Sequence, residues 1–214
     1  MTNKRMMLAV GFVAVVVGVL VSIAAAQDRF TVKSPNGIAF SEFKGYDAWQ
    51  NVAVSQPGVS MTGASDGITN VILANPVMIN AYRSGSPGNG KPFPDGSMIT
   101  KIAWSQVQMP ESPYAVTVPG TLKMVSFIMK DSKRFPDTNG WGYVQFLYDE
   151  KSRTFSAFGK DAAFGKTVCH ECHTRVKNKD YIFTSYPGRG TSWPVLHHGG
   201  GNRSISEIPV KEGD

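Results

Sequence analysis

The feature that most constrains this chain is a short motif close to its C-terminal end. Residues 169–173 read Cys-His-Glu-Cys-His, and the motif holds both cysteines of the 214-residue chain. Two intervening residues let the thiols of Cys169 and Cys172 reach the two vinyl groups of one haem, and His173 then lies under the iron. The motif therefore predicts one covalent haem c, with His173 as the metal ligand, around which the chain must fold.

Three other kinds of site use closely spaced cysteines. A zinc site needs two more ligands, and the other histidines are His170, inside the motif, and His197 and His198 in a glycine-rich tail. A thioredoxin-like redox site is expected in a βαβ setting, which this sequence lacks. A disulfide across so short a loop stabilises a fold poorly. We therefore favour haem attachment.

The N-terminus has the layout of a secretory signal peptide. Two bases precede an apolar run over residues 6–21, and small residues close the segment at 24–26. We expect residues 1–26 to be a signal peptide cleaved after Ala26, which sends the protein to the periplasm. The alternative is an uncleaved membrane anchor, because the apolar segment is just long enough to span a bilayer.

The chain that remains is long enough for one domain with a sizeable core. We expect a haem domain over residues 27–196 and a flexible tail over residues 197–214, which begins His-His-Gly-Gly-Gly-Asn. The formal net charge is +6 without a dense run of Lys or Arg. This balance favours acidic partners and indicates no nucleic-acid binding.

The hydrophobic pattern predicts both strands and helices. Segments of strand composition, bounded by turn residues, lie at 66–73, 97–107, 122–130 and 141–148. Helices are expected at 46–52, at 76–83 after an Asn75-Pro76 start, and within 160–177, whereas the Gly- and Pro-rich segment 84–96 is a loop. The sequence thus predicts an α+β fold, mainly an antiparallel β-sheet with flanking helices.

Function depends on the sixth coordination position of the iron. A methionine or second histidine there gives an electron carrier, whereas an apolar pocket leaves the iron open to small ligands. Six methionines remain after residue 26, and those in apolar segments are Met78, Met98, Met124 and Met129; the other candidate donors are His197 and His198. Buried methionines are more often core residues than ligands, and both histidines lie in the tail. Neither class offers a convincing sixth ligand.

Further segments resemble the cytochrome P-460 family, which includes the gas-binding cytochromes c-prime-beta. They are YDAWQ, NPVMINAYRSG, GKPFPDGSMITK, KDSKRFPD, GWGYVQFLYD and CHECHTRVKNKDYIFTSY, in this order over nearly all of the mature chain. The resemblance implies a mostly antiparallel sheet with helices around one haem, a proximal histidine that matches His173, and a vacant distal side. It also implies a homodimer.

The resemblance implies roles for three more residues. In members that oxidise hydroxylamine, a lysine eight residues after the aromatic of an F-x-D-G turn is bonded to the haem edge. Here Phe93 opens such a turn, and Lys101 lies at the same offset. Phe93 matches an aromatic wall over the iron, and Asp131 a proton relay. Without the resemblance, Lys101 is expected to be a solvent-facing strand lysine, Phe93 a core phenylalanine and Asp131 a turn aspartate.

The sequence departs from the hydroxylamine-oxidising pattern at two positions. Asn70 stands where an arginine is expected, and Val168 supplies no acid. We expect a five-coordinate haem that binds or oxidises nitric oxide or hydroxylamine and exchanges electrons with a redox partner cytochrome. The alternatives are a six-coordinate electron-transfer cytochrome c and a gas-binding sensor module without turnover.

Overall fold

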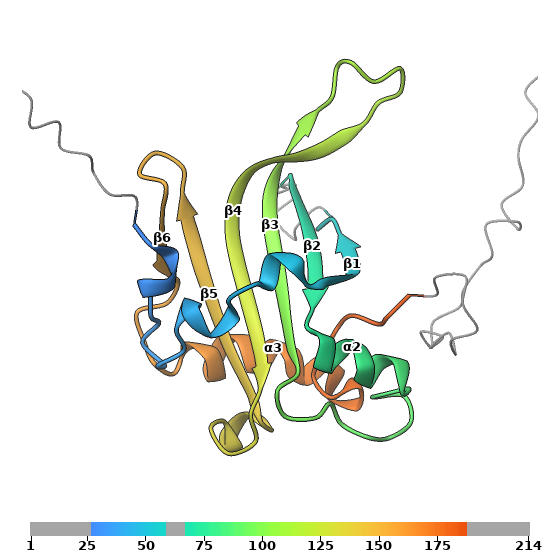
Figure 1. The fold of residues 1–214 in the computed structure, drawn as a ribbon, viewed down its shortest axis with the longest axis vertical. Helices are drawn as coiled ribbons and strands as arrows, with labels where there is room; N and C mark the ends of the chain where they lie inside the picture. The colour runs from blue at the N-terminus through green and yellow to red at the C-terminus, as the bar shows by residue number, and fades with distance from the viewer. Residues whose placement is uncertain (1–26, 59–66, 188–214) are drawn as a thin grey trace, which may run out of the picture.

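The computed structural model describes residues 27–58 and 67–187. The strands are β1 (Gln50–Ser55), β2 (Ile68–Ala74), β3 (Met98–Gln108), β4 (Thr117–Lys130), β5 (Trp141–Asp149) and β6 (Thr154–Ala157). They form one antiparallel sheet in which each strand pairs with the next along the chain. β3 and β4 continue past their neighbours as a long hairpin (Figure 1).

The helical elements are short. They are η1 (Arg29–Thr31), η2 (Phe40–Phe43), η3 (Tyr46–Ala48), α2 (Pro76–Arg83), η4 (Pro136–Thr138), η5 (Gly165–His170), α3 (Glu171–His173) and η6 (Thr174–Lys179). α2 begins as the sequence predicts, because the Asn75 side chain accepts a hydrogen bond from the Met78 N–H at 3.0 Å and Pro76 takes the first helical position. No helix in the described residues is long and apolar enough to cross a membrane.

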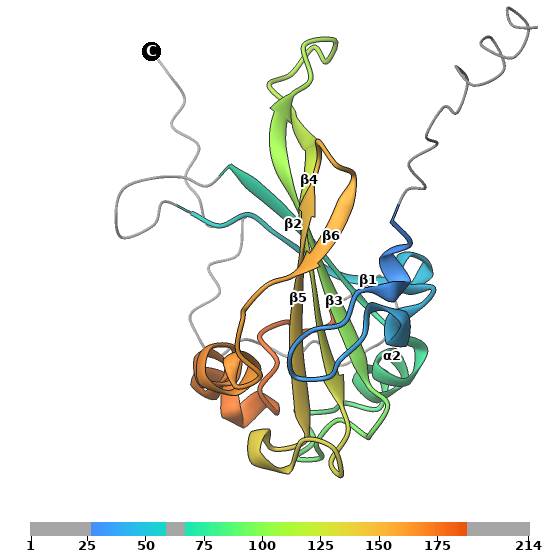
Figure 2. The same cartoon turned by 90° about the vertical axis from the view of Figure 1, so that its left-hand side faces the viewer.

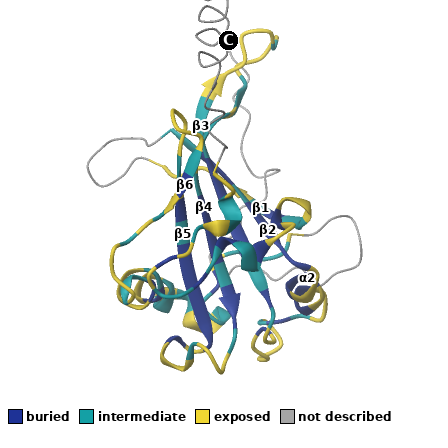
Figure 3. Cartoon of the chain, turned by 60° about the vertical axis from the view of Figure 1, so that its left-hand side comes forward, coloured by how far each residue is buried: buried dark blue, intermediate teal, exposed yellow. Residues whose placement is uncertain are grey.

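The two faces of the sheet carry different layers. On one face lies the N-terminal arm, which is the segment 27–49 before β1. Its Phe40, Phe43 and Tyr46 pack against strand residues such as Phe127 and Phe146. Phe43 stacks on Phe127 with ring centroids 4.0 Å apart. The segment that contains the cysteines lies on the opposite side of the sheet (Figure 2). The central strands are mostly buried between these layers, whereas the tip of the β3–β4 hairpin is exposed (Figure 3).

The structure confirms the α+β class, all four predicted strands and the helices at 76–83 and within 160–177, and it differs from the sequence predictions at two places. The helix expected at 46–52 ends at Ala48, because the β-branched Val52 is buried in β1, where the chain pairs with β2. β6 was not predicted, since it has only four residues and pairs with β5 alone. The helical segment around the cysteines begins at Gly165. Residues 1–26 and 197–214 lie outside the described residues.

Candidate functional site

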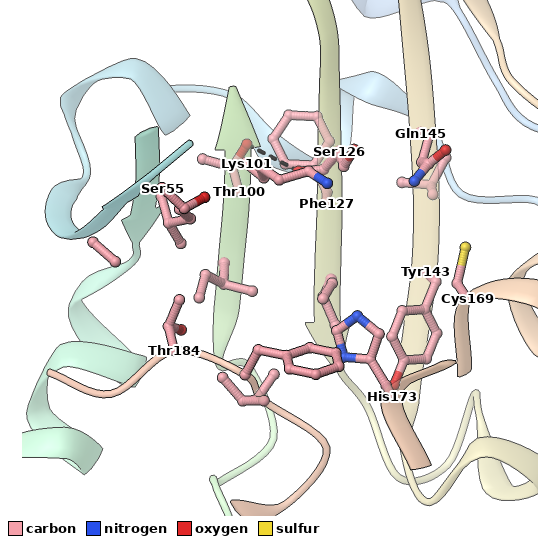
Figure 4. A pocket seen from close by; sticks show the side chains of 17 residues that line it. Ser55, Thr100, Lys101, Ser126, Phe127, Tyr143, Gln145, Cys169, His173 and Thr184 are labelled. Atoms are coloured by element: carbon pink, nitrogen blue, oxygen red, sulfur yellow. Dashed lines mark hydrogen bonds between the residues drawn. The ribbon is translucent and has the colours of Figure 1, made fainter. Parts of the chain in front are cut away.

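A cavity of about 380 Å³ lies on the sheet face opposite the N-terminal arm. Its volume is in the range typical of small-molecule and cofactor sites. β1 to β5 supply its floor, and Cys169, His173 and residues 182–184 close it (Figure 4). The cysteine motif and the sheet therefore meet at one site.

One row of side chains crosses the floor of this cavity. The strand register sets neighbouring members of the row opposite each other, and the row consists of Ala53, Ile72, Lys101, Ser126 and Gln145. Directly opposed residues of an antiparallel sheet point to the same face. All five line the cavity, so the register brings three polar side chains together from strands that are distant in sequence.

Lys101 is half-buried in the cavity wall. Burial lowers the pKa of its amine, and the neighbouring Cys169 and Cys172 oppose this shift only in part. Its amine makes no hydrogen bond or ion pair within the described parts of the chain. Lys101, which lies eight residues after Phe93, is therefore at the cavity, and its amine is not bonded to any described residue.

Ser126 lies next to Lys101 in the row and is only 8% exposed. Its hydroxyl has no hydrogen-bond partner among the described residues. A buried unpaired hydroxyl is costly, so Ser126 offers a donor and an acceptor to whatever fills the cavity.

His173 is held in one orientation by its neighbours. Its Nδ1 lies 2.5 Å from the backbone carbonyl oxygen of Tyr181. A carbonyl only accepts hydrogen bonds, so Nδ1 carries the proton and Nε2 keeps the lone pair that ligates a metal. The ring packs between Tyr143 and Phe183, with centroid distances of 5.1 and 4.9 Å. Burial lowers the pKa of His173, which favours the neutral, ligating form.

The two cysteines lie on a π-helical turn, η5, and the α-turn that follows it. Both are free thiols; Cys169 lines the cavity, whereas Cys172 is exposed. Burial raises the pKa of Cys169 to about 11, which keeps its thiol protonated. No group of three or more His, Cys, Asp or Glu in the described residues is placed to hold a metal ion. Cysteine, imidazole and a mostly apolar cavity together fit a haem.

Besides Cys172, two predicted site residues, Phe93 and Asp131, do not line the cavity. Phe93 is 1% exposed and packs edge-on against Tyr82 and Trp141, with centroid distances of 4.9 and 6.0 Å. The Asp131 carboxylate accepts hydrogen bonds from the N–H groups of Lys133 and Arg134, at 3.1 and 3.0 Å, and so closes a turn. Their roles at the iron stay predictions, and their contacts are those of a core residue and a turn residue.

The other positions singled out in the sequence fall around the site. Asn70 is buried beside the cavity, where its Nδ2 donates to the Ser55 hydroxyl at 3.3 Å, and Val168 is 52% exposed. None of the methionines considered as sixth ligands lines the cavity: Met78, Met98, Met124 and Met129. His197 and His198 lie outside the described residues.

Sequence reasoning missed Ser126, Gln145 and the Tyr181 carbonyl. Ser126 and Gln145 each interrupt an apolar strand, and this is the signal that could have identified them. The Tyr181 carbonyl gave no signal, because a backbone acceptor is invisible in a sequence.

Comparison with known proteins identifies the family of this chain. The model of one family, Cytochrome P460, matches residues 43–184, and a search of curated proteins finds no matching relative. The matched segment contains all strands from β1 to β6 and every residue that lines the cavity. The chain therefore belongs to the cytochrome P460 family and is a haem-binding cytochrome.

Proposed function

We propose that this protein is an exported c-type cytochrome whose single haem is attached through Cys169 and Cys172 and binds nitric oxide at an open iron position. The observation that carries the proposal is the setting of His173. Its Nδ1–H is bonded to the Tyr181 carbonyl, so Nε2 is the ligating atom. Among the described residues, no methionine and no other histidine lines the adjoining cavity to supply a sixth ligand.

The haem, when bound, supplies an iron atom that takes up a small nitrogen ligand and exchanges electrons with a redox partner cytochrome. The protein supplies the surroundings. Ile72, Ile99 and Ile128 line the cavity with apolar surface that excludes water, while Lys101 and Ser126 place two polar groups in it. No carboxylate lines the cavity within the described residues, which favours ligand binding over a reaction that needs a strong base.

Oxidation of hydroxylamine is the second candidate function, and Lys101 is the observation that favours it. Its half-buried, unengaged amine has a lowered pKa, so it has more of the neutral form that acts as a nucleophile. Lys101 would supply Nζ for a bond to the haem edge. That bond would need a two-electron oxidant such as a peroxide, because one hydrogen would leave the amine and one would leave the haem.

Export is part of the proposal and rests on the signal-peptide pattern of residues 1–26. The test is N-terminal sequencing of protein from the periplasmic fraction, which we expect to begin at Gln27. Protein that keeps its presequence and sediments with membranes would support the anchor instead.

Optical spectra of the holoprotein, oxidised, reduced and with nitric oxide, test the proposed function. Lys101→Ala is compared with Lys123→Ala, a matched change at an exposed lysine of β4. High-spin haem c spectra that nitric oxide shifts in all three proteins support gas binding. A red-shifted Soret band that reverts only in Lys101→Ala supports the cross-link and hydroxylamine chemistry. A low-spin spectrum that nitric oxide does not change would rule out both functions.

A further inference from the structure

The chain turns sharply just after η6, at a corner formed by Asp180 and Tyr181. Both residues have left-handed backbones, with φ of 49° and 64°. Successive left-handed residues are costly for L-amino acids, and a tyrosine there is uncommon. Such a corner persists only where surrounding contacts hold it.

The Asp180 carboxylate supplies those contacts. It accepts hydrogen bonds from Lys130 Nζ at 3.0 and 3.2 Å, from Trp141 Nε1 at 3.3 Å and from the Phe93 N–H at 2.8 Å. The side chains of Lys130 and Asp180 are only 6% and 11% exposed. These donors come from β4, β5 and the loop before β3, so one buried carboxylate fixes the corner to three parts of the fold.

The corner directs a backbone carbonyl at the proximal histidine. The Tyr181 N–H donates to the Val176 carbonyl at 3.1 Å, and the Tyr181 carbonyl accepts from Nδ1 of His173. If Asp180 loses its contacts, the corner relaxes toward commoner backbone angles and this carbonyl turns away. The strength of the hydrogen bond to His173 therefore depends on the ion pair behind it.

We propose that Lys130 and Asp180 are positioning residues for the proximal ligand, and that their buried ion pair sets how strongly His173 donates electrons to the haem iron. The inference rests on the haem attachment in the proposed function. A stronger Nδ1–H···O bond makes the imidazole more basic. A more basic ligand stabilises the oxidised iron, so the intact ion pair lowers the reduction potential.

The test measures two quantities on the holoprotein: the reduction potential, and the stretching frequency of the bond between iron and His173 in the reduced, ligand-free state. Asp180→Asn removes the charge and keeps the shape, and Lys130→Gln disrupts the same pair from its other end. We expect both variants to raise the potential and lower the frequency. Trp141→Phe deletes one donor and should shift both quantities less, in the same direction.

The matched control is Lys166→Gln. It breaks an exposed ion pair of the same length, 3.0 Å to Asp137, on the turn that carries the cysteines. We expect wild-type values for this control. Folded Asp180, Lys130 or Trp141 variants with unchanged potential and frequency would overturn the inference, even if they melt earlier. If the first two do not fold, Trp141→Phe decides the question.

Failure of this inference is distinguishable from failure of the proposed function. The reduction potential is measurable in any coordination state and does not depend on nitric oxide. A protein that binds no gas can therefore still show, or fail to show, the shift in potential. Absence of covalent haem in the wild type would instead refute the proposed function and this inference with it.

Discussion

Ser126 provides a direct test of whether the cavity floor contacts the bound ligand. Its hydroxyl is buried, lines the cavity and has no partner in the described residues. We expect this hydroxyl to hydrogen-bond nitric oxide bound at the iron. Ser126→Ala should then weaken nitric oxide binding and leave haem attachment unchanged.

The size of the effect follows from the contact that is lost. One hydrogen bond contributes a net of about 0.5–1.5 kcal/mol, which corresponds to a roughly twofold to tenfold rise in the dissociation constant. Stopped-flow measurement of nitric oxide association and dissociation gives this constant. Because the bond forms after the ligand has arrived, most of the change should appear in the dissociation rate.

Ser97 provides the matched control. Its hydroxyl is also buried and without a partner in the described residues, with 0% exposure, but it does not line the cavity. Both alanine variants should fold, since each removes an unpaired buried hydroxyl that costs about 1–3 kcal/mol. We expect Ser97→Ala to bind nitric oxide as the wild type does. An unchanged constant in Ser126→Ala, or an equal change in both variants, would refute the reasoning.

Two further predictions concern the stability of the fold. Asn75→Ala removes the cap of α2 and a hydrogen bond to the Gly96 carbonyl. The free energy of unfolding, measured in urea, should therefore fall by about 1–3 kcal/mol. The control Asn80→Ala, at an exposed position of α2, should change it by under about 0.5 kcal/mol. Burial acts to raise the pKa of Glu42, but bonds from Arg134 and a backbone N–H hold it below its ordinary value. The stabilisation is present above the unfolded pKa and lost as pH falls through the lowered one, so Glu42→Gln should lower the melting temperature at neutral pH and leave it unchanged in strong acid.

Local sequence patterns predicted the helices and strands that are determined by residues close to them in the sequence. The helix at 76–83 was predictable because Asn75 and Pro76 determine its start within a few residues. The segment 46–52 was not, because its second half becomes a strand only by pairing with β2, and that pairing is invisible in a short window.

The candidate site shows the same division. Spacing alone predicted a site at Cys169, Cys172 and His173, and Cys169 and His173 line the cavity. Asp180 was not, because its donors Lys130, Trp141 and the Phe93 N–H lie 50, 39 and 87 positions away in the sequence. Its inferred role is to hold the backbone turn at Asp180 and Tyr181, and such a turn leaves no pattern in residue types.

The F-x-D-G turn explains why the spacing from Phe93 identifies Lys101 as a site residue, although its neighbour Ser126 was missed. The Phe93 N–H donates to Asp180, and Asp95 accepts hydrogen bonds from the N–H and the hydroxyl of Ser132, at 2.9 and 2.8 Å. These bonds fix the turn against the end of β4. They therefore also fix where β3 begins relative to β4. Alternation along the strand then determines that Lys101 points into the cavity. A shift of one residue would turn Lys101 toward the aromatic core on the other face. The offset of eight residues therefore encodes the register of β3.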